Sequence, residues 1–176
     1  MRRSGLPIPA TLCLTLLLDP ALAAAPSDAR SPPAQPIPIA VIDFDYRDSS
    51  GEVQDLTAEH RERLKAFMSS LRSDLAASAG YRLVDVSCGT EPCSMATATP
   101  SDLVGEAKRA GARLLLYGGI HKKSTLVQWA KVQVVDIEAD KLLVDRWLSF
   151  RGDSDEAWRR AEAFIVEDLK DGLRPR

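Results

Sequence analysis

The stretch from residue 113 to residue 150 reads "RLLLYGGIHKKSTLVQWAKVQVVDIEADKLLVDRWLSF", and it decides the fold. It contains apolar runs over residues 113–120, 126–137 and 142–150, which are joined by the short polar segments "HKKST" and "EADK". Short polar joints between apolar runs are typical of β-hairpins. The stretch therefore predicts three strands that pair as an antiparallel meander.

Side-chain alternation along these strands singles out two tryptophans. Successive residues of a strand point to opposite faces of the sheet. Trp129 and Trp147 then share one mostly polar face, on the same parity as Lys131, Gln133, Asp145 and Ser149. Core packing is the ordinary role of an aromatic residue on a strand. A partly covered polar face offers an alternative, in which Trp129, Lys131 and Trp147 form a surface for a protein partner.

The residues upstream of the meander predict two strands and two helices. Apolar residues on both sides of the strand at 37–46 indicate a position in the middle of a sheet. Apolar residues at three- and four-residue spacing over 57–79 predict a long amphipathic helix, with Thr57 as its N-cap and Gly80 as its stop. A short strand is expected at 81–86. Arg61, Arg63, Lys65 and Arg72 of the long helix are expected on its solvated side.

Two further helices have recognisable ends. Thr99 is placed as an N-cap with Pro100 at the first helical position, and Gly111 follows the end of this helix. The last helix is predicted to begin at the cap pair of Asp153 and Glu156 and to end near Gly172. Its apolar stripe consists of Trp158, Ala161, Ile165 and Leu169.

The predicted order of elements is β-α-β-α-β-β-β-α. A single mixed β-sheet with helices packed on it would bury all the apolar stripes, which defines an α+β sandwich of two or three layers. The length after residue 36 is typical of one domain, expected over 37–173.

The amino-terminal segment resembles an export signal. Arg2 and Arg3 precede the apolar run "TLCLTLLL", and Ala21 and Ala23 are the small residues that a signal peptidase reads. We expect a signal peptide over residues 1–23 and a disordered, proline-rich leader over 24–36. The run is too short to span a bilayer, so we expect a periplasmic protein with no membrane span in its mature form.

Cys88 and Cys93 occur in "SCGTEPCSMA" and have three alternative roles: a structural disulfide, a redox centre or a metal clip. An oxidising compartment favours a disulfide, and the Gly and Pro between the cysteines favour a tight turn. A redox centre normally uses Cys-x-x-Cys, and a zinc site needs four ligands, whereas the chain adds only His60 and His121. The disulfide is the expected role.

The sequence shows few signs of catalysis or of nucleic-acid binding. The formal net charge is −2 and no Lys/Arg block is present, which argues against a nucleic-acid partner. Asp43, Asp45 and Asp48 form an acidic loop that could hold a small molecule or a metal such as calcium, but its spacing differs from a calcium-binding loop. His121 could act as a base, although no nucleophile or carboxylate is tied to it by spacing. No metal and no cofactor is expected.

Several phrases together resemble a known family. They are "AVIDFDYRDSSGE", the cysteine pair before a short helix, "GARLLLYGGIHKKSTL", "VQVVDIEADKLL" and "SFRGDSDEAWRRA". They are similar to DUF3280, also described as DUF2380, a family of small exported bacterial proteins of unknown function. More distantly, the element order resembles the amino-terminal domain of TolB. This resemblance implies the fold and a docking role in the envelope, and "EADK" departs from the usual turn of those domains.

The expected function is a non-enzymatic periplasmic interaction or accessory module with an envelope protein as partner. Two alternatives remain at this point. One is a small-molecule or metal-binding accessory protein that uses the acidic loop, and the other is an enzyme that uses His121.

Overall fold

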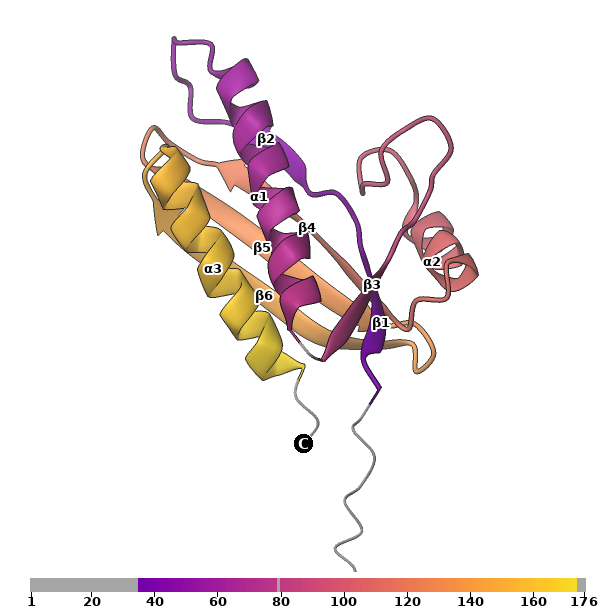
Figure 1. Ribbon diagram of the computed structural model, residues 1–176. Coiled ribbons are helices and arrows are strands. Elements are labelled where there is room, and N and C mark those ends of the chain that lie inside the picture. Colours follow the sequence, from indigo (N-terminus) through magenta and orange to yellow (C-terminus); the bar gives the residue numbers. More distant parts are fainter. Residues whose placement is uncertain (1–34, 79, 174–176) are drawn as a thin grey trace, which may run out of the picture. The chain divides into compact units, whose positions relative to one another are not determined.

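The computed structural model describes residues 35–78 and 80–173 and contains one mixed β-sheet (Figure 1). Its strands lie in the order β3–β1–β4–β5–β6, and β2 extends the line of β1 along β4. The bounds are β1 Ile37–Val41, β2 Asp45–Asp48, β3 Tyr81–Val84, β4 Leu114–Lys122, β5 Val127–Asp136 and β6 Lys141–Arg151. The helices are α1 Thr57–Ala77, α2 Pro100–Arg109 and α3 Asp155–Gly172.

Strand β4 joins the parallel and antiparallel parts of the sheet. It pairs in parallel with β1 and β2, and antiparallel with β5, which in turn pairs antiparallel with β6. The predicted meander and the α+β class with a single mixed sheet are therefore confirmed.

The first strand is broken in two, which differs from the predicted order. Val41 lies opposite Leu116, and Asp45 lies opposite Gly119. The link between β1 and β2 therefore contains one more residue than the part of β4 that runs alongside it. The Phe44 ring packs over Gly118, where an added Cβ would lie 2.7 Å from Phe44 Cζ. This irregularity places residues of the predicted loop in a second strand, β2.

The helices cover the sheet unequally. Helices α1 and α3 lie side by side on one face, and α2 packs on the other, so the domain has three layers (Figure 1). The larger core joins α1 and α3 to inward-facing residues such as Leu116, Ile120 and Val132. The smaller core joins α2 to Ala40, Ile42, Leu115 and Ile137. At the β5–β6 end, the sheet face on the α2 side carries exposed aromatic residues.

Two of the three predicted N-caps are wrong. The α1 helix begins at Thr57, and it is Asp55 Oδ1 that accepts a hydrogen bond from the Thr57 N–H. The Ser154 side chain caps α3 by accepting from the Ala157 N–H, because Asp153 is engaged elsewhere. The Thr99 cap of α2 and the buried stripe of α3 are as predicted.

The expected signal peptide and most of the expected leader lie outside the described residues. Within 35–78 and 80–173, no helix is both long enough and apolar enough to cross a membrane.

Candidate functional site

The structure brings Trp129, Lys131 and Trp147 together on the sheet face opposite α1 and α3. We call this part of the sheet the outer face. Trp129 lies opposite His121 in the β4–β5 ladder, and Lys131 lies opposite Trp147 in the β5–β6 ladder. Neighbouring positions such as Ala130 and Val132 point into the core, so the alternation predicted from the sequence is correct.

The two tryptophans are exposed but held in place. Trp129 is 41% exposed and Trp147 is 65% exposed, and their ring centroids lie 6.4 Å apart in an edge-to-face arrangement. Lys123 Nζ lies 5.3 Å from the Trp129 ring centroid, and Lys131 Nζ lies 5.0 Å from the Trp147 ring centroid. Such aromatic and cation–π contacts favour fixed side-chain positions. The outer face therefore presents a preformed, partly cationic aromatic surface.

His121 belongs to the same face. Its Nε2 lies 2.7 Å from Ser49 Oγ, and its pKa is lowered by burial and by the positive charges of Lys123 and Arg47. Neutral imidazole is the form that this environment favours. A Ser–His contact is present, but the described residues include no carboxylate hydrogen-bonded to the His121 ring, so the arrangement lacks the third group that orients a catalytic base.

The acidic loop is occupied by local contacts. Asp43 Oδ1 accepts a hydrogen bond of 2.6 Å from Arg72, and Asp48 Oδ1 accepts one of 2.7 Å from the Ser50 N–H. Asp45 lies in β2. No group of three or more His, Cys, Asp or Glu side chains among the described residues is arranged to hold a metal ion. A ligand role for this loop stays a prediction.

Cys88 and Cys93 form a disulfide, as expected. It closes the loop between β3 and α2, and Cys93 is buried against the smaller core. The Asp43 N–H donates to the Cys93 carbonyl oxygen at 2.9 Å, so the stapled loop is fastened to the chain between β1 and β2.

A buried ionic network lies at the end of β4 and was missed by sequence reasoning. Lys122 is fully buried, and its Nζ donates to Glu52 and, at 2.6 Å, to Asp153. Burial alone would lower the pKa of Lys122, but these two carboxylates raise it, so the ammonium form is held. The burial of Lys122 could have been predicted from the sequence, because Lys122 lies two residues after Ile120 in the same strand and therefore on the face that points into the core.

Asp153 is the centre of this network. Its carboxylate also contacts His60 Nε2 at 2.8 Å and Arg63 Nη1 at 3.0 Å, so Arg63 is not on a solvated side of α1 as predicted. Burial opposes ionisation of Asp153, yet hydrogen bonds from Lys122 and His60 keep its pKa below the ordinary value. The Tyr46 ring packs at a tilt against His60 with ring centroids 4.8 Å apart, and its buried hydroxyl has no hydrogen-bond partner within residues 35–78 and 80–173. Burial raises the pKa of Tyr46.

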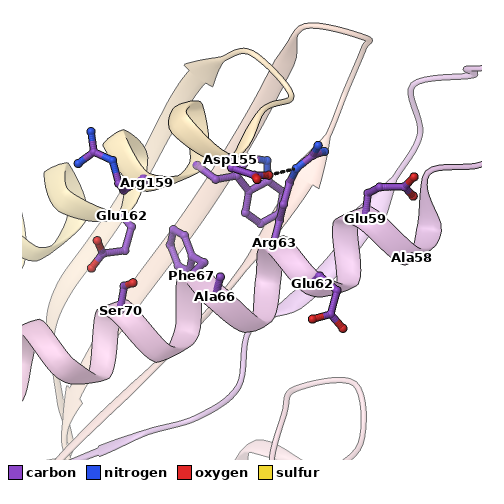
Figure 2. Close-up of a pocket in the computed structure, with 11 residues that line it drawn as sticks. Ala58, Glu59, Glu62, Arg63, Ala66, Phe67, Ser70, Asp155, Arg159 and Glu162 are labelled. Carbon is purple, nitrogen blue, oxygen red and sulfur yellow. Dashed lines mark hydrogen bonds and ion pairs between the residues drawn. The ribbon is translucent and has the colours of Figure 1, made fainter.

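A groove of about 860 Å³ runs between α1 and α3, on the side of the sheet opposite the outer face (Figure 2). Its lining includes the apolar residues Phe67 and Trp158 and the carboxylates of Glu59, Glu62 and Glu162. Glu162 is 3% exposed, and burial together with the negative charge of Asp74 raises its pKa to about 7.

Comparison with known proteins identifies a family and a fold. The sequence model of the family DUF3280, described as "Protein of unknown function (DUF2380)", matches residues 38–169. A search of curated proteins gives no match to this sequence. The hypothetical protein CT253 from Chlamydia trachomatis matches the structure with a TM-score of 0.53 and 14% identity, over 77% of this chain and 96% of CT253.

TolB from Acinetobacter baumannii matches with a TM-score of 0.50 and 14% identity. The match covers 80% of this chain but only 29% of TolB. At such identities the likeness concerns the fold alone, and at that level it confirms the expected resemblance to TolB.

Proposed function

We propose that this chain, which belongs to the DUF3280 family of proteins of unknown function, is a non-enzymatic envelope module that docks a protein partner. The docking surface is the outer face, with Trp129 and Trp147 at its centre. The observation that carries this proposal is the pair of exposed tryptophans, fixed edge to face and flanked by Lys123 and Lys131.

The physical argument concerns conformational entropy. Tryptophan is enriched among the residues that dominate binding energy at protein interfaces. Ordering a mobile side chain on binding costs about 0.5 to 1.5 kcal/mol, and side chains that are already held avoid much of this cost. The two indoles keep much of their apolar area in contact with water, and a partner that covers them removes that area from water.

The outer face also indicates which kinds of side chain a partner would present to it. Lys123 and Lys131 lie beside the aromatic rings, and Lys131 Nζ is 3.7 Å from Asp145 Oδ1. Lys123 makes no ion pair among the described residues. The matching surface would place apolar side chains over the rings and carboxylates near these lysines.

The envelope location is part of the proposal and rests on two supports. The first is the signal-like sequence of residues 1–23. The second is the Cys88–Cys93 disulfide, a bond that persists in oxidising compartments.

The test is site-specific photocrosslinking in intact cells. A photoreactive residue at position 147 is compared with one at position 164, because Phe164 of α3 is an aromatic residue of similar exposure, 61% against 65%. We expect one dominant crosslinked protein from position 147 and none from position 164. With the purified partner, Trp147→Ala should weaken binding by about 30-fold or more, whereas Phe164→Ala should not. A well-folded protein that crosslinks equally from both positions, or from neither, would refute the proposal.

A further inference from the structure

The groove between α1 and α3 has an apolar floor and an acidic lining. Phe67 is 3% exposed and Trp158 is 2% exposed, and both line the groove together with Ala66. Figure 2 shows Glu162 of α3 beside Ser70 of α1, with its carboxylate between the two helices. About 860 Å³ is within the range of pockets that bind small organic molecules.

Glu162 is a buried acid with unmet hydrogen-bonding capacity. Among the described residues, its Oε1 has no hydrogen-bond partner, and neither does Nε1 of Trp158 in the same lining. Leaving a buried polar atom without a partner costs about 1 to 3 kcal/mol. Buried polar atoms in folded proteins are nearly always satisfied, so an unsatisfied one needs an explanation. A ligand that donates a hydrogen bond to Oε1 would supply it.

The charges around the groove favour a cationic donor. Arg63 is bound to Asp153 and Asp155, and Arg159 is bound to Glu156, so both guanidinium groups are already neutralised. Glu59, Glu62 and Glu162 make no ion pair with any described residue. The groove therefore has an excess of unpaired carboxylates over an apolar floor.

We propose that this groove binds a small amphipathic amine, whose apolar chain lies on Phe67 and Trp158 and whose protonated amine donates to Glu162 Oε1. This site is separate from the outer face, because the sheet lies between them. Such a ligand gives Glu162 Oε1 a hydrogen-bond donor, and its apolar chain covers Phe67 and Trp158. A fatty acid would instead place its carboxylate against the carboxyl of Glu162, in a groove that already carries Glu59 and Glu62.

Binding of such an amine depends on pH through Glu162. The charged groups that act on this carboxyl are Asp74 from α1 and Arg159 and Lys170 from α3. An alkylammonium ion stays charged up to about pH 10. The ligand binds the ionised carboxylate, so affinity should rise by about tenfold between pH 6 and pH 8 as Glu162 loses its proton.

The experiment is calorimetric titration of the full chain with three probes of the same chain length: decylammonium, 1-decanol and decanoate. We expect decylammonium to bind at least tenfold more tightly than 1-decanol, and decanoate to bind most weakly. Glu162→Gln should weaken decylammonium binding about tenfold or more. Glu106→Gln on α2 is the matched control and should leave binding unchanged.

A second variant tests the location without changing the charge. Ala66→Trp fills the groove from an exposed position on α1 and should abolish binding of decylammonium while the far-ultraviolet circular dichroism spectrum is unchanged. Equal binding of decylammonium and decanoate, undiminished binding by the Glu162→Gln variant, or undiminished binding by the Ala66→Trp variant would each overturn the proposal.

Discussion

Lys122 Nζ lies 2.6 Å from Asp153 Oδ2, although the Lys122 side chain is fully buried. This ion pair joins the end of β4 to the turn before α3. Glu52 contacts the same ammonium group from the loop that leads into α1. Asp153 also receives His60 and Arg63 from α1, so one buried cluster fastens three segments that are distant in the sequence.

Replacing the buried cation should strongly destabilise the protein. Lys122→Met leaves Glu52 and Asp153 without their common partner, and removal of one member of a buried ion pair costs about 3 to 5 kcal/mol. The measurement is the free energy of unfolding in urea. The control is Lys123→Met, an exposed neighbour, which should change that free energy by about 0.5 kcal/mol or less. Equal stability of the two variants would mean that the cluster contributes little.

Gly118 should not tolerate alanine. An added Cβ would lie 2.3 Å from the Lys131 carbonyl oxygen and 2.7 Å from Phe44 Cζ. Overpacking of this kind costs about 1 to 3 kcal/mol, and the contact with backbone places Gly118→Ala at the upper end. Gly105→Ala on α2 meets open space and should raise stability by about 0.5 to 1 kcal/mol. Thermal unfolding of both variants checks the opposite signs.

Glu162 should make stability fall as the pH rises. Its pKa of about 7 in the folded state is above the ordinary value of 4.5, so the folded protein holds this proton more tightly. Its stabilising effect is complete below pH 4.5 and is lost as the pH rises through 7. The loss amounts to about 3 kcal/mol, at 1.36 kcal/mol for each pH unit.

The Glu162→Gln variant lacks this titration, so it should be about as stable as the native protein at pH 4.5 and more stable at pH 8. Urea unfolding of both proteins at these two pH values gives the difference directly. His121 titrates in the opposite sense, since its pKa is lowered, but its effect cancels in the comparison. A difference that does not change with pH would contradict the assignment.

The disulfide should stabilise the protein only modestly. Cys88 and Cys93 are 5 residues apart, and closing so short a ring contributes about 2 kcal/mol in the loop-entropy model. The Cys88→Ser/Cys93→Ser variant and the reduced native protein should lose a similar amount of unfolding free energy. Alkylation of the native protein without reductant, followed by mass measurement, should find neither thiol free.

Sequence periodicity predicted the structural features that depend only on residues close together in the sequence. The meander, the apolar stripe of α3 and the shared face of Trp129 and Trp147 all follow from local alternation, and the structure has each of them. The disulfide was predicted from the expected oxidising compartment and from the Gly and Pro that lie between its cysteines. These features need no knowledge of which distant segments meet.

The features that sequence reasoning missed depend on distant contacts. Lys122 pairs with Glu52 across 70 residues and with Asp153 across 31. Asp153 resembled a helix cap in the sequence because it precedes α3, but its carboxylate binds the buried ammonium of Lys122 instead. The groove at Glu162 could not be predicted from local sequence either, since it exists only where α1 and α3 pack side by side.

The central place of β4 in the sheet has a consequence for the order in which the chain can fold. Strand β1 is made early, but its Ile39 pairs with Leu114, so this contact waits for much of the chain. The meander and α3, by contrast, assemble from contiguous sequence. Contacts between distant residues slow folding. An amino-terminal fragment that ends before Leu114 lacks β4, β5 and α3, and therefore leaves the part of the α1 apolar stripe that packs on them without its partners.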